Sequence, residues 1–523
     1  MKHFFIYCLI FSMIGMTSCE DWLDVKPKSE IDAEELFETE AGFKDALTGI
    51  YISMTSRDTY GQNLSWGGVE YLAWSYRSLM KSRESYRDFM EYSYDAMYSK
   101  DIIDNIWKQQ YNTIAQINYL LKSLETNGDM LNPTLYNVVK GEALALRAFL
   151  HFDIMRLYGK GNIEKNPSIL DERCIPYVLK YGKHITDQKT YRETFELIHN
   201  DINEALEYLK SDPLYYNEVK RPADYEEVTN NVFFKGTSTK GRETRMSYPA
   251  VKLLEARVWL WEGNKEKANE VAQDLIKGFE KYVTEGDGIH SWATESPDVV
   301  ASSNSTNKDF VFNGELLFAL DVFKLSDYLE SYYAELSGGT QNENRMTQSL
   351  SNLDYLYDWG WGYGAKFCES DLRWQNWYTG LDYNTQERWV TKIKKTDLSK
   401  YSNTLPLMRI SEAYLIATEY AIDKGDTAKA IEYLNFLKRK RNISPDFFLA
   451  STLDAKALRL EVAKEYWKEF VQEGQLFFYY KRVNEPKMLL HGYNGQLFKS
   501  KDMSNKEYQL PYPDIEQDLG QRE

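Results

Sequence analysis

Two tryptophan-rich stretches are the part of this sequence best suited to chemistry with a ligand. The first, YDWGWGYG at 357–364, sets Trp359 and Trp361 between glycines, and the second, DLRWQNWY, follows at 371–378. Glycine beside tryptophan lets the backbone turn and leaves an indole face open. Covering about a third of an aromatic side chain contributes roughly 1 to 2 kcal/mol at about 25 cal/mol per Å². The two stretches therefore predict stacking platforms for an apolar surface such as the C–H face of a sugar ring.

Further candidate residues extend this site. The polar neighbours in the second stretch suit sugar hydroxyls and peptide groups equally, so the class of ligand stays open. A second candidate surface is the segment 74–98, which combines aromatic rings with several charges. For both regions the alternative is that the rings simply pack against a helical core. The complete set of candidate ligand-binding residues is Trp74, Arg77, Tyr92, Trp292, Trp359, Trp361, Asp371, Arg373 and Trp374.

The composition favours a binding protein and argues against one class of partner. Aromatic residues make up 15% of the 523 residues and include 40 Tyr and 13 Trp. Helical proteins also bury many aromatic rings, so this excess alone does not separate a binding surface from a core. The formal net charge is -16. This charge argues against a nucleic-acid partner, because affinity for phosphate comes mainly from clustered Lys and Arg.

The sequence lacks the common catalytic motifs. It contains no His-Glu-x-x-His, no Gly-x-Ser-x-Gly, no phosphate-binding glycine loop and no close Cys/His spacing for zinc. We therefore expect no enzyme, no metal and no cofactor. A surface glycoside hydrolase is the leading alternative, because it needs only two carboxyl groups about 5 to 10 Å apart. A periplasmic receptor with two α/β lobes is a third possibility, disfavoured because β-rich runs such as 310–323 are few.

The start of the chain resembles a bacterial lipoprotein signal. A short basic segment precedes about 13 mostly apolar residues at 4–16, fewer than the roughly 20 that span a membrane. Small residues then lead into Cys19, as in a loosely matched lipobox. The resemblance implies a signal peptide at 1–18, acylation of Cys19, and an outer-membrane, cell-surface location. An ordinary signal peptide is the alternative. Pairing between Cys174 and Cys368 stays open, because they lie almost 200 residues apart.

Amphipathic helices must position these residues. The region 101–209 repeats apolar residues at helical spacing, and its part 141–159 is apolar nearly all round, which predicts a central helix. The segments 258–276 and 419–437 share the pattern G-[ND]-x-x-K-A. In this pattern the glycine closes one helix and the next residue caps another, which predicts interrupted tetratricopeptide-like helix hairpins. The segment 284–380 lacks sustained periodicity and is expected to be an irregular, functional insertion.

Collinear motifs over nearly the full length resemble the SusD/RagB family of outer-membrane lipoproteins. They are WLDVKP at 22–27, LTGIY at 47–51, IAQIN at 114–118, GEALALRAFLHFDIMRLYG at 141–159, IPYV at 175–178, HNDINEAL at 199–206, KLLEARVWLWEGNKEKA at 252–268, LPLMRISEAYLIATEYA at 405–421, IEYLNFLKRKR at 431–441, EFVQEGQLFFYYKR at 469–482 and LPYPDIE at 510–516. The resemblance implies a mostly α-helical SusD-like fold, with four tetratricopeptide-like hairpins and an irregular ligand-binding region. It also implies a binding protein, not an enzyme, that captures glycans or peptides. The expected partner is a SusC-like TonB-dependent transporter, on which such proteins sit as lids.

The resemblance also gives a division of the chain. It implies an N-terminal region at 19–213 and a C-terminal region at 214–523 that includes the insertion. One motif departs from the family. An Arg usually follows the Glu of the EF-x-x-EG motif, whereas Glu465 is followed by Tyr466 here. The resemblance therefore does not predict ion pairing along this helix.

Overall fold

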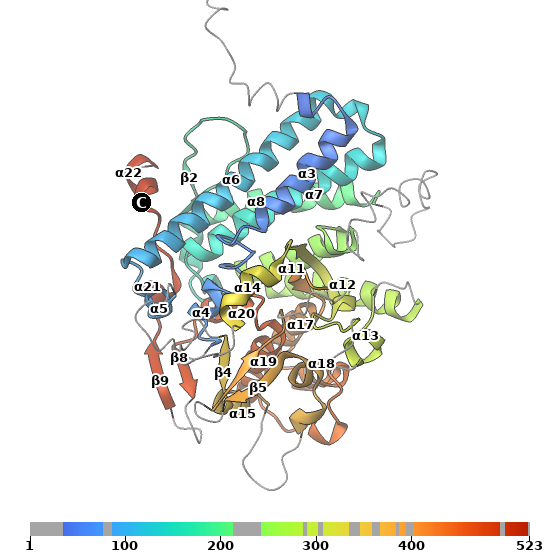
Figure 1. Cartoon of the computed structure of the whole chain (residues 1–523), viewed down its shortest axis with the longest axis vertical. Helices are drawn as coiled ribbons and strands as arrows, with labels where there is room; N and C mark the ends of the chain where they lie inside the picture. Colours follow the sequence, from blue (N-terminus) through green and yellow to red (C-terminus); the bar gives the residue numbers. More distant parts are fainter. Residues whose placement is uncertain are drawn as a thin grey trace, which may run out of the picture.

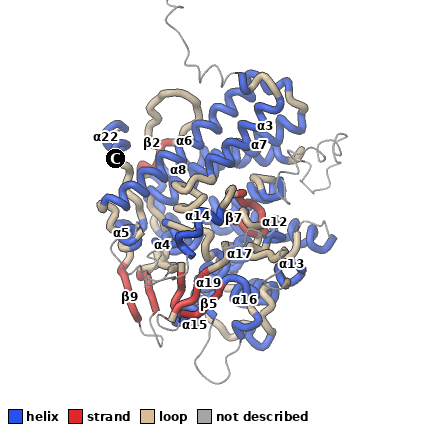
Figure 2. Tube along the Cα trace, in the orientation of Figure 1, coloured by secondary structure: helices blue, strands red, loops and turns tan. Residues whose placement is uncertain are grey.

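Helices form most of the molecule, as the sequence predicts (Figures 1 and 2). The computed structural model describes residues 35–76, 86–212, 242–285, 290–301, 307–333, 346–357, 367–382, 386–393, 401–491 and 497–520. The helices are α3 (Glu40–Met54), α4 (Gly68–Leu72), α5 (Arg87–Met90), α6 (Met97–Asn127), α7 (Pro133–Tyr158), α8 (Tyr191–Leu209), α11 (Tyr248–Glu262), α12 (Lys265–Glu285), α13 (Pro297–Val300), α14 (Leu325–Tyr333), α15 (Leu350–Tyr357), α16 (Leu372–Trp377), α17 (Ser411–Asp423), α18 (Thr427–Lys440), α19 (Ala455–Phe470), α20 (Gln475–Val483), α21 (Asn505–Tyr508) and α22 (Asp514–Gly520). Short 3-10 turns include η3 (Ile163–Lys165) and η4 (Pro167–Asp171).

Helix α7 is the centre of the N-terminal half. Every residue from Gly141 to Tyr158 is buried, because α7 is covered by α6 and α8 on its sides and by α3 and α11 elsewhere. Figure 1 shows α3, α6, α7 and α8 packed side by side in the upper part of the view. Gly159 ends the helix in extended backbone, at φ -92°. A side chain there would meet the carbonyl oxygen of Met155 at 2.6 Å, so the close packing requires glycine.

The two predicted helix hairpins are confirmed. Helices α11 and α12 pack against each other, as do α17 and α18. Gly263 and Gly425 end the first helix of each pair with φ of 95° and 79°, the left-handed region in which glycine is unstrained. Asn264 then accepts the backbone N–H of Lys267 at 3.1 Å, and Asp426 caps α18 in the same way. The G-[ND] dipeptide therefore forms the turn that reverses the chain direction in each hairpin.

The strands form small antiparallel sheets within the described residues. They are β1 (Arg173–Pro176) with β2 (Gln188–Thr190), β3 (Leu316–Asp321) with β7 (Thr404–Arg409), β4 (Thr347–Ser349) and β5 (Tyr378–Asp382) on either side of β6 (Glu387–Val390), and β8 (Lys487–His491) with β9 (Leu497–Asp502). The segment 284–380, predicted to be irregular, is thus built from short elements. Each is too short to show periodicity, and β3 finds its partner in β7, outside the segment.

One hydrophobic core runs through the described chain, from Phe37 to Leu510. At the C-terminal end of α7, residues far apart in sequence bind the same carbonyl group. The backbone N–H of Leu510 donates to the carbonyl of Leu157 at 3.1 Å. The Nζ of Lys481 on α20 donates to the same carbonyl at 3.0 Å. The C-terminal segment therefore completes the packing around the end of α7. The predicted boundary at 213 lies outside the described residues.

Candidate functional site

Trp74 and Tyr92 lie together, as the second candidate surface requires, but their rings are not open. Trp74 is only 1% exposed, and its indole N–H donates to the carbonyl of Met90 at 3.0 Å. The hydroxyl of Tyr92 donates to the carbonyl of Leu72 at 2.7 Å. The two rings stack with centroids 6.4 Å apart. Both residues have left-handed backbone, with φ of 54° and 58°, which is rare for aromatic residues and marks strain that the surroundings must hold.

The hairpin of β8 and β9 supplies cations beside this aromatic pair. The ammonium of Lys499 lies 5.0 Å from the ring centroid of Trp74, and that of Lys501 lies 6.0 Å from Tyr92. Lys499 also forms an ion pair with Glu91. Cations at this distance are attracted by the electron-rich ring face. The expectation that Trp74 presents a bare ring to solvent is therefore wrong for the described structure.

Trp292 is a core residue and not an open platform. It is fully buried, and its indole N–H donates to the carboxylate of Glu280 at 3.0 Å. The rings of Phe279, Tyr414 and Phe436 surround it at centroid distances of 5.3 to 5.6 Å, all near perpendicular. Edge-to-face packing of this kind is favourable in protein cores. Trp292 thus joins α12, α17 and α18, and the prediction that it is exposed is wrong.

Asp371 and Arg373 face inward, contrary to the expectation that they meet a ligand. Both side chains are 0% exposed and pair with each other at 2.7 Å. Asp371 also caps α16 by accepting the backbone N–H of Arg373 at 2.8 Å. Arg373 reaches Glu465 at 2.7 Å and Glu469 at 2.8 Å. Their charges are therefore satisfied inside the protein.

Glu469 is the centre of a buried ionic network that the departure from the family motif did not predict. Besides Arg373, it accepts from Arg441 at 2.7 and 2.8 Å and from Arg409 at 3.0 Å. Burial alone would raise the pKa of Glu469, but these guanidinium groups outweigh it and hold the pKa well below the usual value. Ion pairing on α19 is thus dense, because α16, β7 and the end of α18 add their guanidinium groups to it. Lys468 of α19 itself also pairs with Glu465.

Trp374 is the ring of the predicted set that stays partly accessible in the described chain. It is half-buried, with Tyr357 at 5.5 Å and Tyr378 at 5.8 Å between ring centroids. The guanidinium of Arg388 on β6 lies 5.2 Å from its ring. Three rings and a cation therefore meet at the start of β5. Arg77, Trp359, Trp361 and Cys19 lie outside the described residues.

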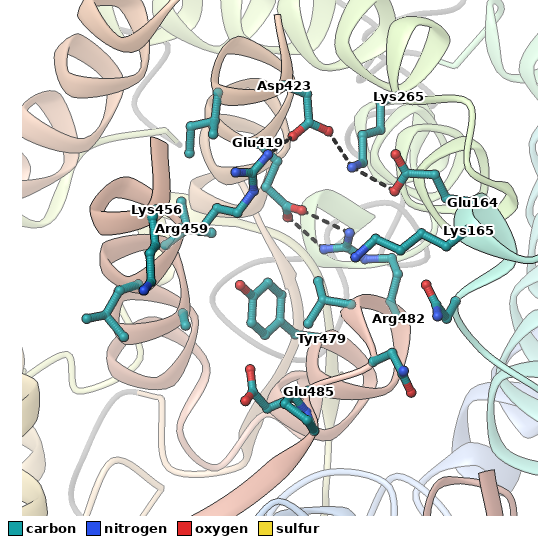
Figure 3. A pocket seen from close by; sticks show the side chains of 18 of the residues that line it. Glu164, Lys165, Lys265, Glu419, Asp423, Lys456, Arg459, Tyr479, Arg482 and Glu485 are labelled. Carbon is teal, nitrogen blue, oxygen red and sulfur yellow. Dashed lines mark hydrogen bonds and ion pairs between the residues drawn. The ribbon is translucent and has the colours of Figure 1, made fainter. Parts of the chain in front are cut away.

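A groove of about 1060 Å³ opens between α17, α19 and α20, with η3 at one side (Figure 3). Ion pairs line its walls. Arg482 binds Glu419 through two bonds of 2.6 and 2.9 Å, and Lys265 lies 2.7 Å from Glu164. Tyr479 projects between these groups, and its hydroxyl makes no hydrogen bond among the described residues. The groove contains none of the residues predicted as ligand contacts.

Sequence reasoning missed the groove although part of it lies in a quoted motif. Tyr479 and Arg482 belong to EFVQEGQLFFYYKR, a motif that predicts the fold and does not by itself indicate a ligand site. The remaining walls come from segments near 164, 265, 419 and 456. Charged residues at helix ends are common on any surface, so only their meeting in space makes them a site. An available signal was the cluster of Asn, Lys and Glu at the end of α20.

The described residues contain neither a membrane-spanning helix nor a metal-binding cluster. That part of the chain holds no helix long and apolar enough to cross a bilayer. It also holds no group of three or more His, Cys, Asp or Glu side chains placed to bind a metal ion. Cys174 is a buried free thiol. The side chain of Cys368 lies outside the described residues.

The overall architecture is shared with solved structures. A SusD superfamily protein from Bacteroides thetaiotaomicron superimposes with a TM-score of 0.67 at 21% identity, covering 92% of this chain and 97% of that one. A protein from Bacteroides vulgatus described as a putative sugar binding protein gives a TM-score of 0.65 at 22% identity, with 92% and 96% covered. The molecule therefore has the SusD fold.

Sequence comparisons agree with the fold. Residues 21–226 match a SusD-like family model described as starch-binding associating with outer membrane. SusD-like protein P25 of Formosa agariphila is 20% identical over 500 residues, covering 88% of this chain and 86% of that protein. SusD-like protein P38 of the same organism is 23% identical over 385 residues, covering 65% and 70%. The chain is thus similar to SusD-like proteins in sequence and shares their fold.

Proposed function

We propose that this protein is a lipid-anchored, surface-exposed binding protein of the outer membrane that captures a glycan and passes it to a partner TonB-dependent transporter. The observation that carries the proposal is the SusD fold over 92% of the chain, together with the match to a starch-binding, outer-membrane-associated family model. A peptide is the other ligand class that the sequence allows. Binding without catalysis fits the absence of common catalytic motifs from the sequence.

The aromatic residues beside the described core support a binding site. Trp74 and Tyr92, near the two ends of the segment 74–98, are held in strained backbone, and Trp374 meets Tyr357 and Tyr378. Strained residues cluster at functional sites, where the surrounding packing compensates for their cost. We propose that the buried rings form a rigid base, and that Trp359 and Trp361 supply the contacts to ligand.

The direct test is a double variant, Trp359→Ala with Trp361→Ala. We expect binding to a retained glycan, identified from a panel of neutral and acidic polysaccharides, to weaken at least tenfold, or about 1.4 kcal/mol. Affinity electrophoresis followed by titration calorimetry measures the loss. The circular dichroism spectrum should not change, because glycine-flanked tryptophans are not needed for the helices.

The matched control is Phe447→Ala. It removes an aromatic ring that is 38% exposed in the 3-10 turn after α18. It should leave glycan binding unchanged. Equal affinities of the double variant and the unaltered protein would refute the site. Release of reducing sugars from any glycan in the panel would instead favour the glycoside hydrolase alternative.

A further inference from the structure

The loop 179–185, between β1 and β2, exposes three large apolar side chains. Leu179 and Tyr181 are each 44% exposed, and Ile185 is 78% exposed. The other residues of the loop are exposed as well, and they are Lys180, Gly182, Lys183 and His184. Large apolar residues are normally buried, so three of them in one short loop mark a surface that contacts another body.

Hydrogen bonds at its base hold this loop away from the core. Val178, directly before the loop, donates its backbone N–H to Nε2 of His151 at 3.0 Å and accepts from Nδ2 of Asn118 at 2.8 Å. After the loop, Nε2 of Gln188 donates to the carbonyl of Cys174 at 2.8 Å, across the pair of β1 and β2. Because both ends are fixed to buried residues, the exposure of the apolar side chains is a property of the folded structure.

The loop lies beside the point at which the described chain begins. The ring centroid of Tyr181 is 4.5 Å from that of Tyr119 on α6, and Tyr119 in turn lies 5.3 Å from Phe37. Asn127, the last residue of α6, donates to the carbonyl of Phe37 at 3.3 Å. Figure 1 shows the arch before β2, the start of α3 and the end of α6 at the same, upper end of the molecule.

Two more exposed apolar side chains lie at this end. Leu36, next to Phe37, is 38% exposed, and Met130 is 45% exposed in the 3-10 turn η2 (Gly128–Met130) that follows α6. Five of the fourteen large apolar side chains that are exposed in the described chain therefore gather around residue 35. Three separate segments supply them, so the cluster forms only in the folded protein.

The charges around this cluster are of both signs. The exposed cations are Lys122, Lys180 and Lys183, and the exposed acids are Glu35, Glu38, Glu125, Asp129 and Asp187. Such a mixture favours neither an anionic nor a cationic partner, so a contact here must depend on the apolar side chains. The lysines of the loop can keep their ammonium groups in water while their neighbours enter an apolar phase.

The lipid anchor proposed at Cys19 identifies the body that this cluster contacts. The 16 steps of chain from Cys19 to Glu35 span at most about 58 Å. A compact chain of this length is about 60 Å across. The far end of the molecule therefore reaches the bilayer only when this segment is almost fully extended, whereas the end around residue 35 reaches it at any extension.

We infer that the loop 179–185, with Leu36 and Met130, is a membrane-contact surface that lies on the lipid headgroups and inserts Leu179, Tyr181 and Ile185 into the interface. Tyrosine is enriched at this boundary, where its ring is buried and its hydroxyl stays wet. The inference rests on the proposed function for the position of the bilayer, but the contact itself needs no acyl chain. A few side chains bind weakly alone, and the anchor raises their effective concentration at the membrane.

The test measures partition of the full mature chain with Cys19→Ala onto phosphatidylcholine vesicles, by sedimentation at millimolar lipid. We expect partition that changes by less than about twofold when phosphatidylglycerol or salt is added, because the charges at this end are mixed. Leu179→Ser with Tyr181→Ser and Ile185→Ser should lower the partition coefficient at least about fivefold, since it removes the apolar surface that enters the interface.

Two further variants separate this loop from general stickiness. Val300→Ser with Phe323→Ser and Phe447→Ser removes apolar side chains that are 56%, 73% and 38% exposed elsewhere, and it should leave partition unchanged. His184→Trp adds a large aromatic ring to the loop and should raise the partition coefficient about three- to tenfold. A gain of this kind does not arise from damage to the fold.

Three outcomes would overturn the inference. They are no partition of the unacylated chain onto vesicles, equal losses in the two triple variants, and no gain from His184→Trp. Acylation of Cys19 and glycan binding are measured separately. An acylated, glycan-binding chain without loop-dependent partition would keep the proposed function and remove the membrane contact. Loop-dependent partition of a chain that is never acylated would keep the contact and remove the anchor.

Discussion

His151, in the middle of α7, is a histidine that the fold keeps neutral. It is completely buried and stacks on Tyr177, with centroids 3.9 Å apart. Its Nδ1–H donates to the carbonyl of Arg147 at 2.9 Å, while its Nε2 accepts the backbone N–H of Val178 at 3.0 Å. The second bond needs an unprotonated nitrogen. Burial lowers the pKa of His151 to about 3.

The lowered pKa of His151 makes the free energy of unfolding depend on pH. An unfolded chain takes up a proton near pH 6.5 that the folded chain refuses until about pH 3, so stability falls as the pH falls through this window. The slope is about 1.4 kcal/mol per pH unit for one such group. We expect His151→Gln, which keeps one donor and one acceptor without titrating, to reduce the loss of unfolding free energy between pH 7 and 4.5 by about 2 to 3 kcal/mol.

Urea unfolding at the two pH values measures this difference. The same change at the exposed His184 is the control and should leave the acid sensitivity as it is. An unchanged loss of stability in the His151→Gln protein would show that its neutral state does not limit stability in acid.

For single residues, the sequence shows which side chains can bind a ligand but does not show whether they are exposed. Trp74, Trp292, Asp371 and Arg373 were expected to meet a ligand, yet each is buried with its polar atoms paired. Their partners lie on other segments, such as Glu280 for Trp292 and Glu465 for Arg373. A local pattern cannot show which distant group will satisfy an indole N–H or a guanidinium.

Among the elements, α19 carries several buried charges of both signs. Glu465 and Glu469 lie one turn apart on it, and Glu473 follows just beyond its end. Glu473 pairs with Arg409 at 2.8 Å and with Lys392 at 2.5 Å. Each of these carboxylates is at most 1% exposed, so α19 is fixed to its neighbours by ion pairs that water does not screen.

Removing the central charge should be costly. Glu469→Gln removes one of the buried carboxylates that Arg409 and Arg441 share, the other being Glu315. We expect the free energy of unfolding to fall by about 3 to 5 kcal/mol. Chemical denaturation at pH 7 gives this value. The control is Glu432→Gln, which breaks an exposed pair with Lys429 at 2.8 Å and should cost no more than about 1 kcal/mol. A loss under 1 kcal/mol for Glu469→Gln would contradict the importance of the network.

Elements with strong local signals were predictable. The hairpins α11–α12 and α17–α18 followed from glycine and a capping residue at fixed spacing, and the structure places both caps as expected. The elements of 284–380 were not predictable. Strands of three to six residues, such as β4 and β3, depend on partners such as β6 and β7 more than on their own sequence.

For the whole molecule, the order of motifs along the chain was sufficient to predict a SusD-like fold, which a solved structure at 21% identity shares over 92% of this chain. The cell surface location is a property of the whole chain that we propose on the basis of Cys19. Replacing Cys19 by Ala should abolish labelling by an alkyne-tagged palmitate and move the protein from the membrane fraction to the soluble fraction. Click chemistry on immunoprecipitated protein measures the label.

The control for this experiment is Cys174→Ser, since Cys174 is a buried free thiol away from the chain terminus. It should retain the label fully. Labelling that survives Cys19→Ala would place the lipid elsewhere or show that another signal anchors the protein.

The contacts between the N-terminal half and residues 507–510 also affect how the protein folds. The hydroxyl of Tyr94 bonds the backbone of Glu507 across a sequence separation of 413 residues, and Leu510 covers the end of α7. A nascent polypeptide that has not yet gained residues 507–510 leaves the end of α7 exposed to water. Folding at this place therefore waits for residues synthesised about 350 positions later, and a chaperone has a long interval in which to hold the incomplete chain.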